Sequence, residues 1–238
     1  NFHLENYENT KELTNSQDIT PEETEAFFNH YSGKLSELDL EIISHVPQGG
    51  NWKNIPTSVP SKRLETIRES FSRGEGSRST YYGRLKPGAP SYTINTYFSR
   101  PGNGCHIHYD QERVISQREA ARFQSFPDKF RFYGSQRDIN TQIGNAVPPL
   151  LAHQISNLIT SSIQEPGSFV DLFCGAGGMG LGFTWSNWKP IIANDIEKKF
   201  LETYSQNVHS AVVEGSLYEE KVFNELVIQT LKAKKLNP

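Results

Sequence analysis

The sequence predicts an α/β fold, and three observations in its C-terminal third support this. Short β-prone runs at residues 168–173, 190–195 and 210–215 alternate with a short helix, with a longer helix at Glu197 to Asn207, and with a last helix from Glu219. Such alternation predicts parallel strands joined by helical crossovers. The first run also leads into five glycines (SFVDLFCGAGGMGLGF), a composition typical of a tight turn that approaches a ligand.

The remaining elements are predicted from caps, periodicity and turn-formers. Residues 1–19 are polar and aperiodic, and a helix is expected from the Thr20 cap, with Pro21 in its first turn, to Gly33. Residues 47–61 are rich in turn-formers, and residues 78–104 predict a small irregular β subdomain. Further helices are expected over residues 34–44, 61–72, Ser116 to Pro127, and 147–163, the last as a buried helix.

Composition bounds the class of protein. The chain has 238 residues, 35% of them hydrophobic, and a mean hydropathy of -0.59, which predicts a soluble globular protein. No apolar run approaches the ~20 residues that span a bilayer, and the first residues lack a signal-peptide pattern, so a cytoplasmic location without membrane partners is the default expectation. Two cysteines, Cys105 and Cys174, do not make a disulfide framework.

Charge is distributed unevenly along the chain. Residues 1–44 hold two Lys or Arg against ten Asp or Glu, whereas residues 62–137 hold fourteen against seven. A basic middle with interleaved aromatics (RSTYYGRLK) is compatible with a nucleic-acid footprint, because phosphate neutralisation supplies most sequence-independent affinity. On charge alone a solvated, loop-rich face remains the simpler interpretation.

The glycine loop admits two ligands. Gly175, Gly177 and Gly180 satisfy G-x-G-x-x-G, and Asp195 lies twenty positions after Gly175. This is the dinucleotide fingerprint, with glycines admitting a pyrophosphate and the acid holding the ribose. The same layout suits S-adenosylmethionine, and a plain strand-to-helix turn is the third possibility.

The residues around the glycines favour the second ligand. DLFCGAGGMGLGF resembles the first motif of the DNA cytosine-5 methyltransferases, and ANDIEKKFLETYSQN resembles their second. The resemblance implies that Phe173 packs on the adenine ring, Asp195 binds the ribose diol and Ile196 contacts the adenine. The further contacts that it implies, from the loop and from the third-motif segment VVEGSLYEE, are Cys174, Gly175, Ala176, Gly177, Gly178, Met179, Ser216 and Leu217. Ser216 stands where the family generally has an acid, and a hydroxyl is a weaker acceptor than a carboxylate.

Two upstream segments complete the resemblance. REAARFQSFPDKFRFYG, residues 118–134, is similar to the family's ninth motif, and QIGNAVPPLLA, residues 142–152, to its tenth. Asn145 thereby inherits contact with the methionyl end of the cofactor, with Ala146 and Val147 beside it. The implied fold is a partial Rossmann-like S-adenosylmethionine-dependent methyltransferase domain with a small irregular β-rich target-recognition domain.

The motif order and two absences qualify this resemblance. Motifs nine and ten precede motifs one and two, as in circular permutants of the family, and residues 164–167 form a short linker of at most ~14 Å. The family's Pro-Cys nucleophile loop and its Glu-Asn-Val motif are missing, so no catalytic residue is assigned to this chain. The missing motifs either continue in the same polypeptide or come from a partner subunit. The start at Asn1 and the unfinished α/β unit favour the first alternative.

The predicted organisation has five parts. It comprises an acidic tail with helices at residues 1–45, a target-recognition region at 46–115, ninth- and tenth-motif helices at 116–163, the permutation linker at 164–167, and an incomplete cofactor-binding half at 168–238. The predicted DNA-contacting residues are Lys62, Arg63, Arg78, Tyr82 and Arg84.

The cysteines, the histidines near Cys105 and two arginines are not assigned a catalytic, metal-binding or phosphate-binding role. Cys174 lies in the cofactor loop rather than beside a flipped base, where a nucleophilic thiolate belongs. Cys105, His106 and His108 do not make the four-ligand set of structural zinc, so no metal is assigned. Arg118 and Arg122 lie one helical turn apart and are expected to brace domains rather than bind phosphate.

The function expected is that of a site-specific DNA cytosine-5 methyltransferase. The intact enzyme would flip a cytosine from double-stranded DNA, add a cysteine thiolate to C6 and methylate C5 from S-adenosylmethionine. The resemblance implies a restriction-modification setting with a cognate restriction endonuclease, in a bacterial cytoplasm or in association with DNA. The alternatives are a non-catalytic DNA-binding or regulatory subunit, and an NAD-dependent oxidoreductase.

Overall fold

The computed structural model describes residues 28–75 and 80–236. The chain divides into two compact units. The sheet unit comprises residues up to Asn29 together with Gln124–Pro238, and the small unit comprises His30–Phe123. Most of the helix expected from Thr20 to Gly33 lies outside the described residues.

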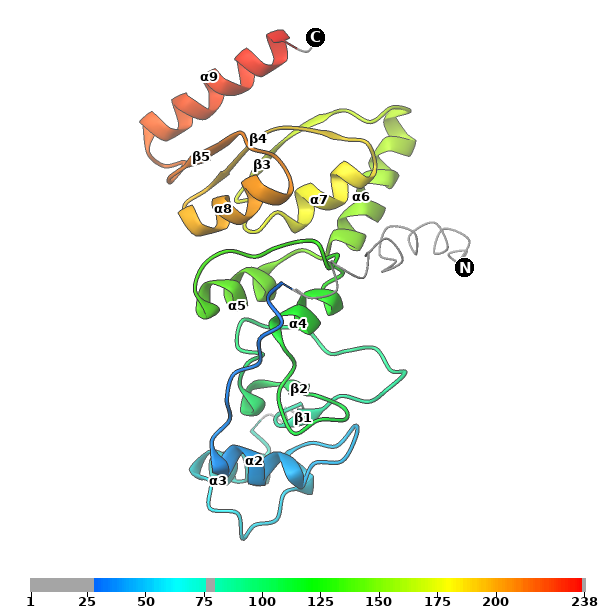
Figure 1. Ribbon diagram of the computed structural model, residues 1–238, viewed down its shortest axis with the longest axis vertical. Coiled ribbons are helices and arrows are strands. Elements are labelled where there is room, and N and C mark those ends of the chain that lie inside the picture. Colours follow the sequence, from blue (N-terminus) through cyan, green and yellow to red (C-terminus); the bar gives the residue numbers. More distant parts are fainter. Residues whose placement is uncertain (1–27, 76–79, 237–238) are drawn as a thin grey trace. The chain divides into compact units, whose positions relative to one another are not determined.

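The sheet unit is built on three parallel strands in the order β3-β4-β5. The strands are β3 (Ser168–Leu172), β4 (Lys189–Asp195) and β5 (Val212–Glu214). Helices α7 (Gly178–Trp185) and α8 (Lys198–Asn207) lie on one face of the sheet, and α9 (Glu220–Leu236) lies on the other (Figure 1). The mixed α/β alternation predicted for this third of the chain is confirmed.

Apolar side chains cover both faces of the sheet because each strand alternates its side chains. On the α8 face, Ala193 packs with Leu201, Tyr204 and Cys174. The neighbouring residue of β4 points the other way and packs with the α9 face, where the buried cluster consists of Ile192, Val213, Val222 and Leu226. Central strand β4 is therefore buried on both sides, as a parallel strand between helical layers should be.

Helix α6 (Pro149–Ile163) packs along α7 with one face only. Ala152 and Ser156 are buried, and the Ser156 hydroxyl donates to the Ser186 hydroxyl at 2.6 Å. The expectation of a buried helix was wrong for its other face, which exposes Leu151, Leu158 and Ile163 by 53%, 59% and 54%. Helical periodicity located the helix correctly, but most of its apolar residues have no covering element among the described residues.

Helix α5 (Gln136–Asn145) was not predicted. It begins at a capping box, in which the Ser135 hydroxyl accepts from the Asp138 amide and the Asp138 carboxylate accepts from the Ser135 amide. The sequence does contain a helix-start signal, Ser135-x-x-Asp138. The internal Gly144 and the polar composition, however, make the helical spacing of the apolar residues hard to recognise.

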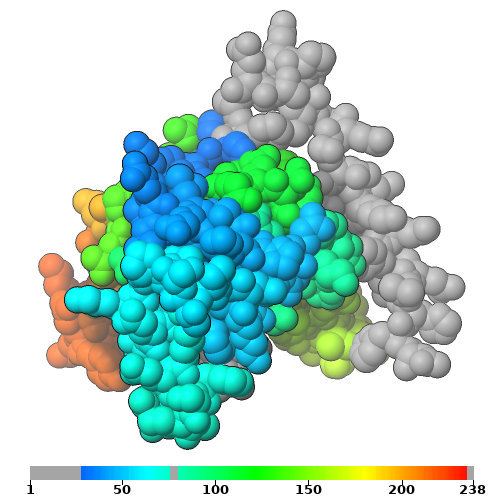
Figure 2. Space-filling view, turned by 90° about the horizontal axis from the view of Figure 1, so that it is seen from below, coloured from blue at the N-terminus to red at the C-terminus, as the bar shows by residue number. Residues whose placement is uncertain are grey.

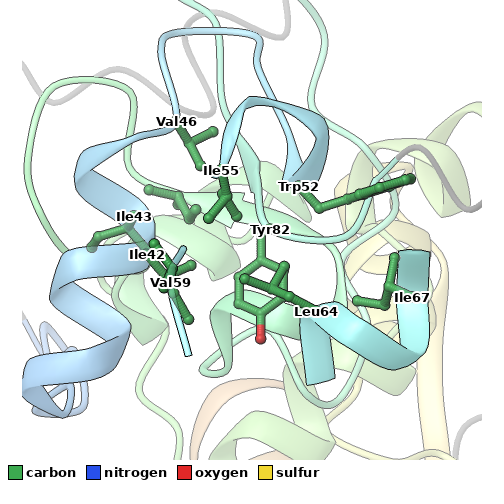
Figure 3. Close-up of a cluster of buried hydrophobic side chains, with 10 residues drawn as sticks. Ile42, Ile43, Val46, Trp52, Ile55, Val59, Leu64, Ile67 and Tyr82 are labelled. Atoms are coloured by element: carbon green, nitrogen blue, oxygen red, sulfur yellow. The ribbon is translucent and has the colours of Figure 1, made fainter. Parts of the chain in front are cut away.

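The small unit contains little regular β-structure. Its helices are α2 (Glu37–Ser44), α3 (Lys62–Ser72) and α4 (Gln117–Phe123), together with 3₁₀ turns at Trp52–Asn54 and Pro101–Asn103. The predicted β subdomain amounts to two parallel strands, β1 (Gly83–Arg84) and β2 (Cys105–Ile107). The core comes instead from helices and turns, and Figure 3 shows it. It consists of Ile42, Ile43, Val46, Trp52, Ile55, Val59, Leu64, Ile67, Tyr82 and Ile107.

The small unit extends from His30 to Phe123 and includes α2 and α4. The predicted target-recognition region, residues 46–115, lies within it. Helix α4 begins as expected after Ser116, whose hydroxyl accepts from the Glu119 amide while Glu119 accepts from the Ser116 amide.

In the part of the chain that the structure describes, no helix has the length and apolarity to cross a membrane.

Candidate functional site

Three parallel strands end at one edge of the sheet unit, and three of the predicted cofactor residues follow them. Phe173 comes after β3, Ile196 after β4 and Ser216 shortly after β5. Open parallel sheets bind ligands at this carboxyl edge. Phe173 is 76% exposed and Ile196 is 64% exposed, so two apolar side chains at the ends of adjacent strands face solvent. Phe173 also has a φ of 54°, a left-handed conformation unusual for a bulky residue, and such strain is concentrated at functional sites.

Asp195 connects the end of β4 to the glycine loop. Its Oδ2 accepts from the Gly175 amide at 2.8 Å, and its Oδ1 accepts from the Glu197 amide at 2.9 Å. The carboxylate is buried and therefore held in one orientation. Each oxygen has two lone pairs, so both retain an acceptor position after these contacts.

Asp171 lies beneath the first turn of α7. The N-cap of α7 is Gly177, which has no side chain to accept from the free amides of the first turn. The buried Asp171 carboxyl lies close to Gly180 and to the Tyr204 hydroxyl, but its Oδ2 and that hydroxyl have no hydrogen-bond partner among the described residues. Burial raises the pKa of Asp171 to about 6, and the charge of Asp195 also contributes to the increase.

The glycine loop lies directly against the turn that carries Asn145. A Cβ atom at Gly178 would collide with the Val147 carbonyl oxygen, and one at Gly182 would collide with the Pro149 carbonyl oxygen. Glycine at these two positions allows the first turn of α7 and the start of α6 to meet at backbone distance. The two motifs, far apart along the chain, are therefore neighbours in the sheet unit, with Asn145 exposed at the end of α5.

Two side chains from the ninth-motif segment fix this turn. The Gln124 side-chain amide donates to the carbonyl oxygens of Ile143 at 3.0 Å and Ala146 at 3.4 Å. The Ser125 hydroxyl accepts from the Leu150 amide at 3.1 Å. Sequence reasoning placed both residues in a motif but assigned them no role. Their polar character within FQSFP was the available signal.

The remaining predicted cofactor residues differ in accessibility. Met179 is 43% exposed, whereas Ala176 is buried and offers backbone contacts at most. The Ser216 hydroxyl accepts from the Tyr218 amide at 3.3 Å. Leu217 packs with the apolar cluster beneath α9, so its side chain is directed toward the core. The Asn194 side chain, which was not predicted, donates to the carbonyl oxygens of Val213 and Gly215 and holds the Ser216 turn against β4.

Both cysteine thiols are unsuited to nucleophilic attack. Burial raises the pKa of Cys174, and the nearby charges of Asp171 and Asp195 raise it further. Burial raises the pKa of Cys105 to about 11. A nucleophilic cysteine needs a lowered pKa and access to its substrate.

Two of the predicted DNA-contacting residues are exposed and two are not. Lys62 and Arg63 lie exposed on α3, and the Arg63 guanidinium lies 5.0 Å from the ring centroid of Tyr81. The blue-to-cyan part of the chain forms much of the face that Figure 2 shows. Arg78 lies outside the described residues. The prediction was wrong for Tyr82, whose side chain is part of the core of the small unit.

Arg84 is also a correction, because it is a buried structural cation. It is 5% exposed and donates to the carbonyl oxygens of Val46 at 2.6 Å and Ile43 at 2.8 Å. Further donations go to the carbonyl oxygens of His108 and Gln111, and it forms an ion pair with Glu112 at 3.1 Å. Its five N–H donors are thus used within the small unit. Basic composition alone does not separate this role from phosphate binding.

The histidines near β2 have ordinary protein partners. His106 is fully buried, and burial lowers its pKa, while its Nε2 lies 3.4 Å from the Thr93 carbonyl oxygen. His108 Nδ1 accepts from the amides of Asp110 and Gln111. Over residues 28–75 and 80–236, no group of three or more His, Cys, Asp or Glu side chains could hold a metal ion. Of the two arginines on α4, Arg118 is buried and Arg122 is exposed.

Comparison with known proteins identifies the family. The sequence profile of the C-5 cytosine-specific DNA methylases matches residues 1–161 and 167–230. The chain belongs to this family. The two matched segments of this methylase chain are separated by residues 162–166, which cover the end of α6 and most of the predicted linker.

Curated relatives of this methylase chain agree with the assignment. It is 43% identical over 115 residues to the DNA (cytosine-5-)-methyltransferase M.ApeKI of Aeropyrum pernix, covering 47% of this chain and 23% of that protein. It is 48% identical over 107 residues to the type II methyltransferase M.AgeI of Thalassovita gelatinovora, covering 45% and 23%. It is 35% identical over 124 residues to the type II methyltransferase M.BbvI of Brevibacillus brevis, covering 51% and 30%. The matched parts therefore span less than a third of each of these relatives.

Proposed function

We propose that this chain supplies the S-adenosylmethionine site and the DNA-recognition region of a site-specific DNA cytosine-5 methyltransferase. The observation that carries the cofactor assignment is the pair of buried carboxylates beneath the glycine loop. Asp195 accepts from the Gly175 amide, and Asp171 Oδ2 lies 2.6 Å from the position that a Cβ atom at Gly180 would take. One backbone donor that a pyrophosphate would use in a dinucleotide site is thus already paired with an acidic side chain, and a second carboxyl group lies beside the loop.

Electrostatics then separates the two cofactor classes. A pyrophosphate at the start of α7 would meet two carboxyl groups and would be repelled. A sulfonium cofactor with an ammonium group carries positive charge and would be attracted. The carboxyl groups of Asp171 and Asp195 beside the glycine loop therefore favour S-adenosylmethionine over NAD. They disfavour the oxidoreductase alternative.

The residues at the carboxyl edge of the sheet are proposed to contact different parts of the cofactor. Phe173 and Ile196, exposed at adjacent strand ends, flank the adenine, and Asp195 binds the ribose hydroxyls through its remaining lone pairs. Asn145 contacts the methionyl end, from a turn that Gln124 fixes against α7. The bound cofactor would supply the methyl group, while the chain's own residues bind and orient it.

The small unit is proposed to face DNA. The exposed Lys62 and Arg63 on α3 are suited to phosphate contacts, which position the protein on the duplex without reading its sequence. Relatives named as type II methyltransferases support a restriction-modification role with a cognate endonuclease.

The nucleophile and the base-contacting glutamate are proposed to come from polypeptide outside these residues, in the same chain or in a partner. The sequence has no cysteine preceded by proline. Strand β3 has a partner only on its β4 side among the described residues, so its other edge can accept a further strand. Circular permutation is supported by the packing of α6 on α7, since the four residues Gln164 to Gly167 need join only adjacent elements.

The non-catalytic alternative is supported by one observation, the lack of a suitable thiol in this chain. Co-expression with the polypeptide encoded beside it, followed by a methyl-transfer assay on DNA, distinguishes the two. Transfer that requires the Pro-Cys loop of the added polypeptide supports the enzyme. Binding of DNA without transfer in any combination supports the regulatory module.

The cofactor assignment is tested by calorimetry with S-adenosylmethionine and with NAD. We expect the chain to bind S-adenosylmethionine and not NAD. Asp195→Ala should weaken binding by about tenfold or more, because it removes a charged hydrogen-bond acceptor and releases the Gly175 amide. Glu202→Gln, an exposed carboxylate on α8, is the matched control and should bind like the wild type. Binding of NAD alone would end this proposal.

A further inference from the structure

Three large side chains lie exposed across the ends of three neighbouring strands. Phe173 follows β3, Ile196 follows β4 and Tyr218 comes shortly after β5. The Tyr218 side chain is 102% exposed, as much as in an extended peptide. Single apolar side chains are normal on a protein surface, whereas a row of them at one edge marks a binding site. The proposed cofactor site uses Phe173 and Ile196 but not Tyr218.

Backbone hydrogen bonds hold the three strand ends beside one another. The Cys174 amide donates to the Asn194 carbonyl oxygen at 3.0 Å, and the Gly215 amide donates to the Asp195 carbonyl oxygen at 3.0 Å. Neighbouring strands lie about 4.8 Å apart, so the row of three ends spans about 10 Å. This span is comparable to the width of a purine ring system with its van der Waals surface.

The turn that carries Tyr218 is fixed at the end of β5. The Ser216 hydroxyl accepts from the Tyr218 amide at 3.3 Å, and the Ser216 carbonyl oxygen accepts from the Glu219 amide at 2.9 Å. Leu217 packs with the apolar cluster beneath α9. The backbone of Tyr218 is thus held in place, while its side chain stands in solvent where a ligand can contact it.

We propose that Tyr218 is a third adenine-binding residue, whose ring closes over the adenine of the cofactor from the β5 side. This inference rests on the proposed cofactor and adds a residue to the same site. Tyr218 then makes the adenine contact that the family resemblance implied for Leu217, because the Leu217 side chain is directed toward the core. Stacking of an exposed aromatic ring on a base is favourable and removes apolar surface from water.

Replacement of Tyr218 separates the ring from the hydroxyl group. Tyr218→Ala should weaken binding of S-adenosylmethionine by about tenfold in calorimetry, because a stacked aromatic ring is lost. Tyr218→Phe keeps the ring and should bind like the wild type. Phe223→Ala, which removes an exposed aromatic ring from α9, is the matched control and should also bind like the wild type. Thermal melting establishes that each variant is folded.

Chemical protection of Tyr218 gives a second readout on the unmodified chain. Tetranitromethane nitrates exposed tyrosine rings, and peptide mass spectrometry measures the nitration of each tyrosine. Saturating S-adenosylmethionine or adenosine should protect Tyr218, because both carry adenine, whereas methionine should leave it reactive. Tyr92, which is 57% exposed and belongs to the small unit, reports the general reactivity in each sample.

The outcomes distinguish this inference from the proposed function. If S-adenosylmethionine binds but leaves Tyr218 as reactive as before, or if Tyr218→Ala binds like the wild type, the role of Tyr218 is refuted and the cofactor assignment stands. Protection by methionine instead of adenosine would place the other end of the cofactor here and would also refute it. A Tyr218→Phe variant that binds as weakly as Tyr218→Ala would refute the stacking of the ring. If S-adenosylmethionine does not bind at all, both proposals are refuted.

Discussion

At the residue scale, Arg84 and Arg63 show that equal charge does not mean equal role. Both were expected to contact DNA, yet Arg84 is buried among four carbonyl oxygens and Glu112, while Arg63 is exposed on α3. The difference comes from where the chain places each guanidinium, which a local charge count does not record. The two arginines therefore make a matched pair for experiment.

Replacing Arg84 by Met should destabilise the small unit by about 3–5 kcal/mol, because buried carbonyl groups and Glu112 lose their partner. Replacing Arg63 by Met should leave stability unchanged within ~0.5 kcal/mol and weaken DNA binding at low salt. Urea denaturation and a DNA-binding assay at two salt concentrations measure these effects. A folded, stable Arg84→Met variant with lost DNA affinity would show that the original assignment was right.

At the element scale, the contact between α6 and α7 depends on glycine. A side chain at Gly182 would collide with the Pro149 carbonyl oxygen and come within 2.6 Å of Ala152 Cβ. Gly182→Ala should destabilise the sheet unit by about 1–3 kcal/mol through overpacking and should weaken cofactor binding by displacing the Asn145 turn. Gly33→Ala is the control, since nothing lies within 4 Å of its added Cβ atom. Equal melting temperatures for the two variants would contradict the close approach.

The elements predicted well were those whose signals are local. The strands with their glycine loop, and the helices with Ser or Pro starts, follow from caps and periodicity that a short window contains. Helix α5 was not predicted because few of its residues are apolar and their helical spacing is weak. The exposure of the outer face of α6 was missed because burial depends on elements elsewhere in the fold. The roles of Gln124 and Asn194 were missed because both side chains donate to carbonyl oxygens that only the fold brings near them.

At the scale of the whole molecule, Glu119 of the small unit and Asp171 of the sheet unit should contribute to stability with opposite dependence on pH. In the small unit, burial opposes ionisation of Glu119, but hydrogen bonds from Arg113 and the Ser116 amide outweigh it and lower the pKa of Glu119 to about 2. A lowered pKa gives stability that is present above the unfolded value and lost as pH falls toward 2. In the sheet unit, the raised pKa of Asp171 gives stability that is present at low pH and lost as pH rises through 6.

Acid titration followed by hydrogen exchange tests this contrast. Between pH 4.5 and pH 2 the small unit should lose up to about 3 kcal/mol, and Glu119→Gln should abolish most of that pH dependence. Exchange of amides around α4 reports the small unit, and exchange of amides in β3 and β4 reports the sheet unit. An unchanged loss of protection around α4 in Glu119→Gln would contradict the assignment to Glu119.

Within the described ranges β3 pairs on one side only, and this matters for handling the protein. A strand edge with open amide and carbonyl groups is a template on which other chains can add, and the uncovered apolar faces of α6 and α9 increase that tendency. Produced alone at high concentration, the chain should therefore self-associate and precipitate. Supplying the complementary polypeptide during expression should keep it in solution.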